Sequence, residues 1–257
     1  MTSYRIIASD MTRSLSRISQ QPMVQRETEY YLENIGNVKS VDDFMNDDRL
    51  YRYAMKAFGL DDMSYAKAFV RKVLTEGVID PDSFANRLSD TRYKELATAF
   101  NFSAYGDKAT TYESAKQGTV DKYMRQTLEE NAGQQNEGVR LALYFTRKAS
   151  SIKSAYNILG DKALLTVFQT AFNIPAATGN MNIDKQAKMI EDLIDIDSFQ
   201  DPEVLNKFLT RFTAMYEMNN MTAASASPAV MLLGGSASIG ISDNILTTLQ
   251  SFKLGGR

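Results

Sequence analysis

Cysteine, histidine and tryptophan are all absent from this chain of 257 residues. Without cysteine the chain can form neither disulfides nor a reactive thiolate. Without cysteine and histidine it also lacks the usual ligands of zinc and haem, and the Ser-His-Asp and Cys-His nucleophilic arrangements are excluded. Only carboxylates, lysine and tyrosine remain as the common general acids or bases. We therefore expect a protein that has no cofactor and no metal site and is not an enzyme.

Long apolar runs and clustered basic residues are also missing. Lysine and arginine are scattered and the formal net charge is -2, whereas nucleic-acid binding depends on basic patches that neutralise phosphates. The longest apolar stretch near the end, residues 229–233, is far shorter than the roughly 20 residues that cross a bilayer. The first ten residues lack the apolar core of a cleavable signal peptide. We expect no nucleic-acid partner, no transmembrane segment and no cleavable signal.

What the chain does have is helical periodicity along most of its length. Bulky apolar residues recur three or four positions apart, which places them on one face of a helix. The widest such stripe contains Leu205, Phe208, Leu209, Phe212 and Tyr216. We find no convincing run with the alternating pattern of a strand. The sequence therefore predicts an all-α protein.

Two parts of the chain resemble each other, which predicts an internal duplication. The sequence Asp-Pro-Asp-Ser-Phe at 80–84 is similar to Asp-Ile-Asp-Ser-Phe at 195–199. In the same order, Ala-Phe-Gly-Leu at 57–60 is similar to Ala-Phe-Asn-Ile at 171–174. Chance likeness between amphipathic helices is the alternative, but several anchors agree in order.

The predicted organisation has two related helical units, joined by long helices and flanked by different termini. An N-terminal amphipathic arm and helix occupies residues 1–40, and helical unit one follows at 41–105. Connecting helices, with a turn at the polar stretch 129–138, lead to helical unit two. The five segments are 1–40, 41–105, 106–154 for the connecting helices, 155–220 for helical unit two, and 221–257 for a tail rich in alanine, serine and glycine.

The tail carries the only residues that we single out as a possible partner-binding site. Its composition is typical of a flexible or loosely packed segment. A short amphipathic stretch within it spaces Ile241, Ile245, Leu249 and Phe252 so that they share one helical face. We expect this face to bind another protein or another part of the chain.

Two motifs that suggest chemistry have simpler explanations. The acidic stretch that begins at Asp195 fails as a calcium loop, because Phe199 and Gln200 stand where a ligand and a glycine are required. We expect its acids to cap helices instead. Ser-x-x-Lys occurs at 64–67 and 150–153 and Ser-Asp-Asn at 242–244, but the accompanying Lys-Thr-Gly of penicillin-recognising enzymes is absent.

Four stretches together are similar to a known family. They are Pro-Met-Val-Gln-Arg-Glu-Thr at 22–28 before two tyrosines at 30–31, Val-Asp-Asp-Phe at 41–44 with Asp-Arg-Leu at 48–50, Ala-Phe-Gly-Leu at 57–60 before Ala-Phe at 68–69, and Asp-Ser-Phe-Ala-Asn at 82–86 with Arg-Tyr at 92–93. They resemble a domain-of-unknown-function family of alphaproteobacteria, often encoded beside flagellar genes and labelled flagellar or flagellar basal-body-associated protein. The resemblance covers most of the chain and brings no catalytic residues with it.

The resemblance implies a non-enzymatic, flagellum-associated structural or interaction protein in a bacterium. It would bind basal-body, hook or export components through helical surfaces or its tails, in the cytoplasm or at the flagellum. One alternative is a cytoplasmic helical adaptor or chaperone unconnected with the flagellum. Another is a hydrolase that uses a pair of carboxylates, although none of the 31 acidic residues is marked out for this role. The N-terminal motif of rod and hook proteins is missing, so we do not expect an axial subunit.

Overall fold

The computed structural model describes residues 2–220, which form helices joined by short loops without any β-strand. This confirms the prediction of an all-α protein. The α-helices are α1 (Thr2–Ser9), α2 (Met11–Ser19), α3 (Pro22–Ile35), α4 (Val41–Asn46), α5 (Asp48–Ala57), α6 (Lys67–Glu76), α7 (Phe84–Arg87), α8 (Thr91–Ala99), α9 (Phe102–Tyr105), α10 (Gln117–Gln135), α11 (Glu137–Lys148), α12 (Ala155–Leu159), α13 (Lys162–Phe172), α14 (Ile183–Leu193) and α15 (Pro202–Asn220). The 3-10 helices are η1 (Asp61–Met63), η2 (Gly106–Thr111), η3 (Ala149–Ser151), η4 (Ala176–Asn180) and η5 (Ile196–Gln200).

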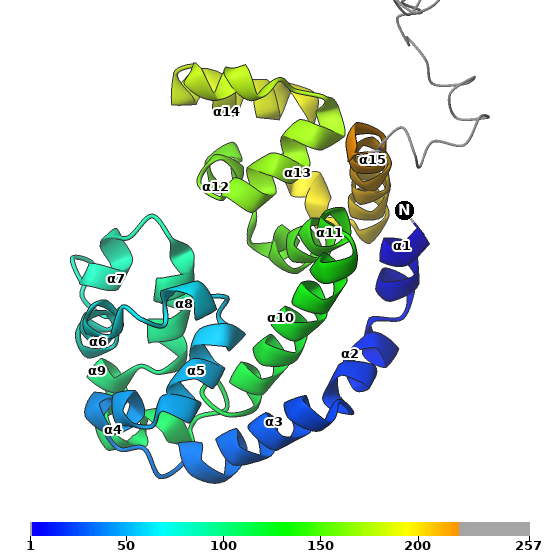
Figure 1. Cartoon of the computed structure of the whole chain (residues 1–257). Coiled ribbons are helices and arrows are strands. Elements are labelled where there is room, and N and C mark those ends of the chain that lie inside the picture. The colour runs from blue at the N-terminus through cyan, green and yellow to red at the C-terminus, as the bar shows by residue number, and fades with distance from the viewer. Residues whose placement is uncertain (1, 221–257) are drawn as a thin grey trace, which may run out of the picture. The chain divides into compact units, whose positions relative to one another are not determined.

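The chain divides into a unit at Met1–Glu217 and a second unit at Met218–Arg257. Within the first unit, the neighbouring helices α10 and α11 link the other helices together (Figure 1). Helix α10 packs against α2, α5 and α11, and α11 packs against α1 and α13. Both helices fall within residues 106–154, where the sequence predicts connecting helices. Because they contact helices from both ends of the unit, they lie at its centre.

The turn between α10 and α11 is shorter than the sequence predicts. The polar stretch 129–138 is mostly helical, because α10 continues through Gly133 and ends at Gln135. The turn is made by Asn136, whose side chain accepts a hydrogen bond from the backbone N–H of Val139 and so caps α11. A glycine inside a helix costs only about 1 kcal/mol, which the packing of α10 against α11 outweighs.

The spacing of five apolar residues within 141–159 predicts one face of a single helix, but the structure breaks this stretch; the five are Leu141, Phe145, Ile152, Tyr156 and Leu159. Helix α11 ends at Lys148, and the 3-10 helix η3 follows it. A new helix, α12, then begins at a capping box of Ser154 and Asn157. In it the backbone N–H of Ser154 donates to the side-chain oxygen of Asn157 at 3.1 Å. The serine-rich sequence here favours a cap over continued helix, because its hydroxyl groups compete for backbone hydrogen bonds.

The first helical region comprises α3 to α9, and three stacked tyrosines join it to α10. The ring of Tyr53 on α5 stacks against Tyr31 on α3, with centroids 4.4 Å apart, and against Tyr123 on α10, with centroids 3.9 Å apart. The hydroxyl of Tyr31 donates to the carbonyl of Ala115 at 2.5 Å, and that of Tyr53 lies 3.0 Å from the hydroxyl of Thr28. Each buried hydroxyl therefore has a partner, and each ring pair adds about 0.5–1.5 kcal/mol to the burial of its area.

The second helical region comprises α11 to α15, and a cluster of phenylalanines packs its helices together. Phe145 on α11 packs against Phe199 on η5 and Phe208 on α15, with centroids 5.2 and 5.0 Å apart. Phe168 on α13 joins Phe208 from the other side. Leu209 and Phe212 are fully buried as well, so the predicted apolar stripe of α15 faces the core.

The first two helices, α1 and α2, have one apolar side and one polar side. Tyr4 on α1 and Ile18 on α2 are buried, and Met11 and Leu15 pack on the core between them. The Tyr4 hydroxyl lies 3.2 Å from that of Thr146 on α11. The arm therefore docks on the helical unit through its apolar side and leaves its polar side to solvent.

The order of helices in α3–α8 recurs in α11–α15, together with details of capping. Asp47 begins α5 by accepting hydrogen bonds from the second and third backbone N–H groups of the turn, and Asp161 begins α13 in the same way. Each aspartate also accepts the hydroxyl hydrogen of a tyrosine on the preceding long helix, Tyr30 at 2.8 Å and Tyr144 at 2.6 Å. The duplication itself stays a prediction, with which these shared contacts agree.

Candidate functional site

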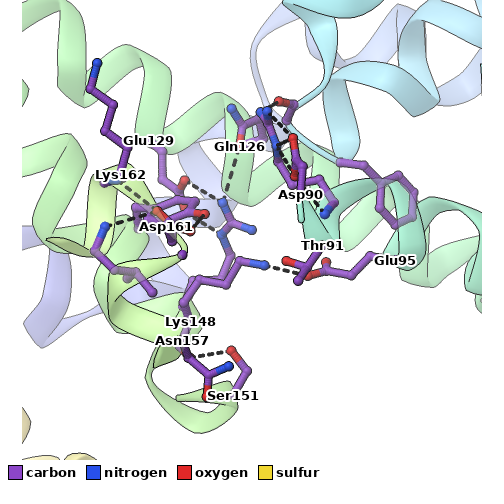
Figure 2. Close-up of a pocket in the computed structure, with 18 of the residues that line it drawn as sticks. Asp90, Thr91, Glu95, Gln126, Glu129, Lys148, Ser151, Asn157, Asp161 and Lys162 are labelled. Carbon is purple, nitrogen blue, oxygen red and sulfur yellow. Dashed lines mark hydrogen bonds and ion pairs between the residues drawn. The ribbon is translucent and has the colours of Figure 1, made fainter. Parts of the chain in front are cut away.

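The first unit contains a cleft of about 800 Å³ between its two helical regions. Its walls come from the loop after α5, the start of α8, and helices α10, α11, α12 and α13. Seven acidic and five basic residues line it. Figure 2 shows charged side chains from several helices turned toward one another there. The lining is therefore suited to a charged or polar ligand rather than to an apolar one.

A buried ion pair between α10 and α11 forms one wall of the cleft. The Arg147 guanidinium donates to both carboxylate oxygens of Glu129, at 2.7 and 2.9 Å. The Glu129 side chain is only 5% exposed and that of Arg147 19%. Burial by itself lowers the pKa of Arg147, but the hydrogen bonds and the charge of Glu129 outweigh burial and raise it. Such a bidentate pair has a defined geometry, because two parallel hydrogen bonds fix the guanidinium against the carboxylate.

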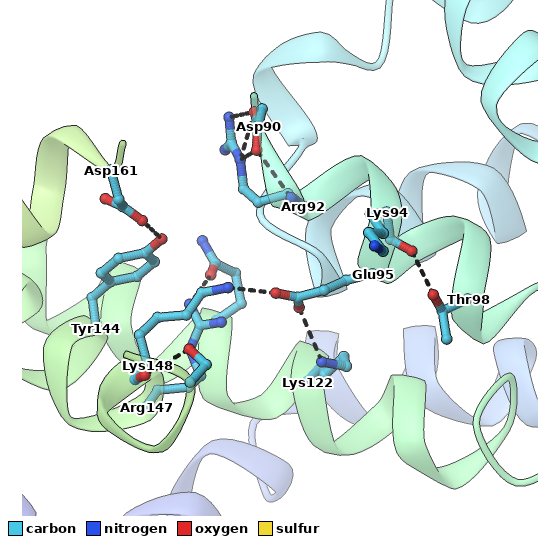
Figure 3. Close-up of polar contacts among 12 residues, drawn as sticks. Asp90, Arg92, Lys94, Glu95, Thr98, Lys122, Tyr144, Arg147, Lys148 and Asp161 are labelled. Carbon is cyan, nitrogen blue, oxygen red and sulfur yellow. Dashed lines mark hydrogen bonds and ion pairs between the residues drawn. The ribbon is translucent and has the colours of Figure 1, made fainter. Parts of the chain in front are cut away.

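A second set of charges connects α8 with α10 and α11. The Glu95 carboxylate accepts a hydrogen bond from Lys148 at 2.5 Å and lies 3.4 Å from the ammonium group of Lys122 (Figure 3). Burial raises the pKa of Glu95, and the two lysines lower it by a larger amount, so that the net shift is downward. Glu95 therefore remains an anion that joins the first helical region to the central helices.

The start of α8 forms the neighbouring wall. The Arg92 guanidinium bonds both oxygens of Asp90, the shortest contact being 2.7 Å, and also donates to the carbonyl oxygen of Gly59. Burial raises the pKa of Asp90, but its hydrogen bonds from Arg92 lower it more. Asp90 also caps α8 through the backbone N–H of Arg92. The loop after α5 is thereby tied to α8.

On the opposite wall, Tyr144 of α11 donates its hydroxyl to Asp161 at 2.6 Å (Figure 3). Burial, followed by the hydrogen bond to the carboxylate, raises the pKa of Tyr144. The guanidinium of Arg147 lies 5.0 Å from the centre of the Tyr144 ring. Since Asp161 also caps α13, this contact sets the position of α13 relative to α11.

Two carboxylates of the cleft do not have the pKa of a general acid. Glu95 and Asp90 have lowered pKa values, whereas a carboxyl group acting as a general acid needs a raised one. Tyr144 remains protonated because its pKa is raised. Within the described residues, no group of three or more acidic side chains is placed to hold a metal ion.

The structure places the sequence-predicted site residues as follows. Ile241, Ile245, Leu249 and Phe252 lie outside the described residues. The prediction that the acids of 195–203 cap helices is confirmed for Asp195, which accepts from the backbone N–H of Asp197, and for Asp201, which accepts from that of Glu203.

The first Ser-x-x-Lys motif is not assembled as a catalytic pair. Ser64 donates its hydroxyl to the carbonyl of Asp61 at 2.7 Å, and the ammonium group of Lys67 lies 3.0 Å from the carboxylate of Asp48.

None of the helices described between residues 2 and 220 is long and apolar enough to cross a membrane.

The cleft residues were not found from the sequence because they are far apart in it. Glu95 and Lys148 are separated by 53 positions, and Arg147 and Glu129 by 18. One signal was present: Tyr144, Arg147 and Lys148 follow one another at helical spacing on a helix that is otherwise strongly apolar. Charged residues on such a helix need partners when they are buried.

Fold and site together define an all-α protein with a charged cleft between two helical regions. This chain belongs to the family described as protein of unknown function (DUF1217), whose model matches residues 57–205. This confirms the resemblance to a domain-of-unknown-function family. The chain is also similar to a protein from Agrobacterium tumefaciens, known from an X-ray crystal structure, with 57% sequence identity and a TM-score of 0.80. The match covers 86% of this chain and 94% of that one. Among curated proteins, none matches the chain.

Proposed function

We propose that this protein is a non-enzymatic, flagellum-associated component that binds other flagellar proteins, and that the charged cleft is its binding site. The flagellar part of the proposal is supported by the family resemblance of its sequence motifs. The cleft is the observation that supports binding. Its volume of about 800 Å³ falls within the range of roughly 300–1,000 Å³ that is typical of ligand sites.

The walls of the cleft are organised before a ligand arrives. The ion pairs Arg147–Glu129 and Lys148–Glu95 bring side chains from α8, α10 and α11 into defined positions. Binding then loses little side-chain entropy, because these groups are already ordered. The cleft can therefore recognise the shape and charge of a polar segment of a partner protein.

The charges of the cleft favour a partner segment with basic residues. Seven carboxylates and five basic groups line it, which leaves a formal charge of -2. Asp61 and Asp62 belong to the 3-10 helix η1 at its edge, and neither forms a direct ion pair among the described residues. A lysine or arginine of the partner can pair with them without disturbing the pairs already formed in the walls.

A pull-down from the native organism tests the proposal. Tagged full-length protein is recovered from separate cytosolic and flagellar fractions, and its partners are identified by mass spectrometry. The test variant Asp61→Lys with Asp62→Lys reverses the charge at the cleft edge. The matched control, Asp107→Lys with Glu113→Lys, makes the same change in net charge at exposed positions outside the cleft lining.

We expect basal-body, hook or export components with the unaltered protein and the control, and a clear loss of them with the cleft variant. We also expect deletion of the gene to impair swimming. Normal swimming with intact flagella, together with recovery of cytosolic clients alone, would contradict the flagellar proposal and favour the adaptor or chaperone alternative. Equal recovery by both variants would exclude the cleft as the binding site.

A further inference from the structure

Two exposed surfaces of the first unit have opposite charge. The first is the solvent side of residues 2–26, where Arg5, Arg13, Arg17 and Arg26 are all exposed and Asp10 is the one acidic residue. These five residues give residues 2–26 a formal charge of +3. None of the four arginines forms an ion pair with another described residue. We call this surface the basic arm.

The second surface is the end of α14 with η5 and the start of α15. Residues 191–203 contain six acidic residues and no lysine or arginine, a formal charge of -6. All six are exposed: Glu191, Asp192, Asp195, Asp197, Asp201 and Glu203. None is in an ion pair with another described residue. We call this surface the acidic end.

Each surface also presents a large apolar side chain to solvent. Ile6 in the basic arm is 61% exposed, and Leu193 in the acidic end is 43% exposed. An apolar centre surrounded by charged side chains is the usual composition of a protein interface. Covering either surface would therefore bury apolar area as well as neutralise charge, and both effects favour association.

The position of the acids at the end of α14 is unfavourable for the helix itself. Glu191 and Asp192 lie in its last turn, where the helix dipole repels negative charge. Asp195 and Asp201 have a local role as caps, but no hydrogen bond within the described residues accounts for Glu191 or Asp192. A residue pair that weakens its own helix without a local contact is best explained by a partner outside the unit.

We propose that this protein associates with itself head to tail, with the basic arm of one copy docked on the acidic end of another. The arm packs on α10 and α11, whereas α14 packs on α12 (Figure 1), so different elements carry the two surfaces. A contact between two different surfaces is heterologous and leads to a chain or a ring of copies. The complementary charges steer the encounter and make it sensitive to salt.

Sedimentation velocity of the full chain over a wide range of concentration tests this inference. We expect oligomers that grow with concentration and dissociate in high salt. The variants Arg13→Glu with Arg17→Glu, and Glu191→Lys with Asp192→Lys, should each weaken self-association by roughly tenfold or more. The second variant places lysines at a helix C-terminus, so it should remain folded with an equal or higher melting temperature.

The decisive sample combines Arg13→Glu and Arg17→Glu with four changes at the acidic end, Glu191→Lys, Asp192→Lys, Asp197→Lys and Glu203→Lys. Residues 2–26 then carry a formal charge of -1 and residues 191–203 one of +2, so the surfaces are again opposite in charge and self-association should return. Lys94→Glu with Lys108→Glu matches the net charge of the arm variant, and Asp107→Lys with Glu113→Lys matches that of the end variant. All four positions are exposed and lie outside both surfaces, so both controls should associate as the unaltered protein does. A protein that stays monomeric at every concentration, or a sixfold variant that fails to associate although it is folded, would overturn the inference.

Discussion

Helices α6 and α14 hold the same place in the two helical regions, but they use their charged side chains differently. On α6, Arg71 pairs with Asp42 of α4, and Lys72 lies 3.7 Å from Glu76 one turn later. On α14, Glu191 and Asp192 have no such partner among the described residues. Caps recur in the two regions, while the charged surfaces of these two helices differ. Of these two helices, α14 is therefore the one that carries acidic side chains without an ion pair among the described residues.

The largest expected effect comes from breaking the ion pair that joins α10 to α11, on which the second region rests. Glu129→Ala leaves the mostly buried guanidinium of Arg147 without a carboxylate, with only a 3.4 Å hydrogen bond to Gln126 remaining, and should destabilise the protein by about 3 kcal/mol in denaturant unfolding. Glu137→Ala removes the exposed partner of Arg140 and serves as control, with an expected loss below about 0.5 kcal/mol. Replacing both buried partners, by Glu129→Leu with Arg147→Met, should recover most of the loss. Equal losses in the two single variants would contradict the role of burial.

A smaller loss of stability should follow from replacing a glycine at which the two regions differ. Gly138 on α11 stands where α3 has the buried Val24, and an added Cβ would approach the ring of Tyr216 to 2.5 Å. Gly138→Ala should therefore cost about 1–3 kcal/mol through overpacking. Gly133→Ala on α10 would place its Cβ 2.8 Å from Cδ and 3.2 Å from Cβ of Arg140, so this contact offsets the gain of about 1 kcal/mol in helix propensity and the net change should be near zero. Thermal unfolding of the two variants distinguishes these outcomes, and stabilisation by both would show that Tyr216 moves aside without cost.

The two equivalent caps sharpen the comparison further. Asp47→Ala and Asp161→Ala each remove a helix cap and the partner of a tyrosine hydroxyl. Each should cost about 1–2 kcal/mol, and the double variant should lose the sum to within about 0.5 kcal/mol. Denaturant unfolding measures all three values. A loss confined to one of the two single variants would mean that the recurring caps do not play equal parts in the two regions.

The smallest effect concerns pH, and it is expected at the cleft that lies between the regions. The folded-state pKa of Glu95 is below its ordinary value of 4.5, so its contribution to stability is complete above about pH 4.5 and is lost as the pH falls through the lower folded value. Glu95 is 36% exposed, so solvent screening keeps this contribution below about 1 kcal/mol. Stability measured against pH should fall less steeply below pH 4.5 in Glu95→Gln than in the unaltered protein. Parallel curves would show that Glu95 is not held as an anion by its lysines.

Local order was predictable because it depends on neighbours in the sequence. Helical class follows from periodicity such as that of Phe208 and Phe212, both of which face the core. Caps such as Asp195 follow from short polar side chains that precede a helix. The errors arose where local signals competed: Gly133 suggested a turn inside α10, and the apolar spacing of 141–159 concealed the break before Ser154.

The cleft was not predictable, because each of its walls depends on contacts between distant parts of the chain. Lys148 has several carboxylates that it could reach in an unfolded chain, and only the packing of α8 beside α11 selects Glu95. The same holds for Arg92, which bonds the carbonyl of Gly59 across 33 positions. The sequence does not specify which charges pair, because the attraction depends on the distance between opposite charges and not on which residues carry them.

The sequence by itself determined that the chain is all-α, that its helices begin at particular caps, and that histidine and cysteine chemistry is excluded. Both kinds of statement depend on composition and on residues within one or two turns of each other. Only the tertiary structure decided which charges are paired in the cleft and which remain exposed on the basic arm and the acidic end. The physical reason is that burial and pairing are properties of the packed helices, because a charge becomes costly or useful only once its surroundings have lost water.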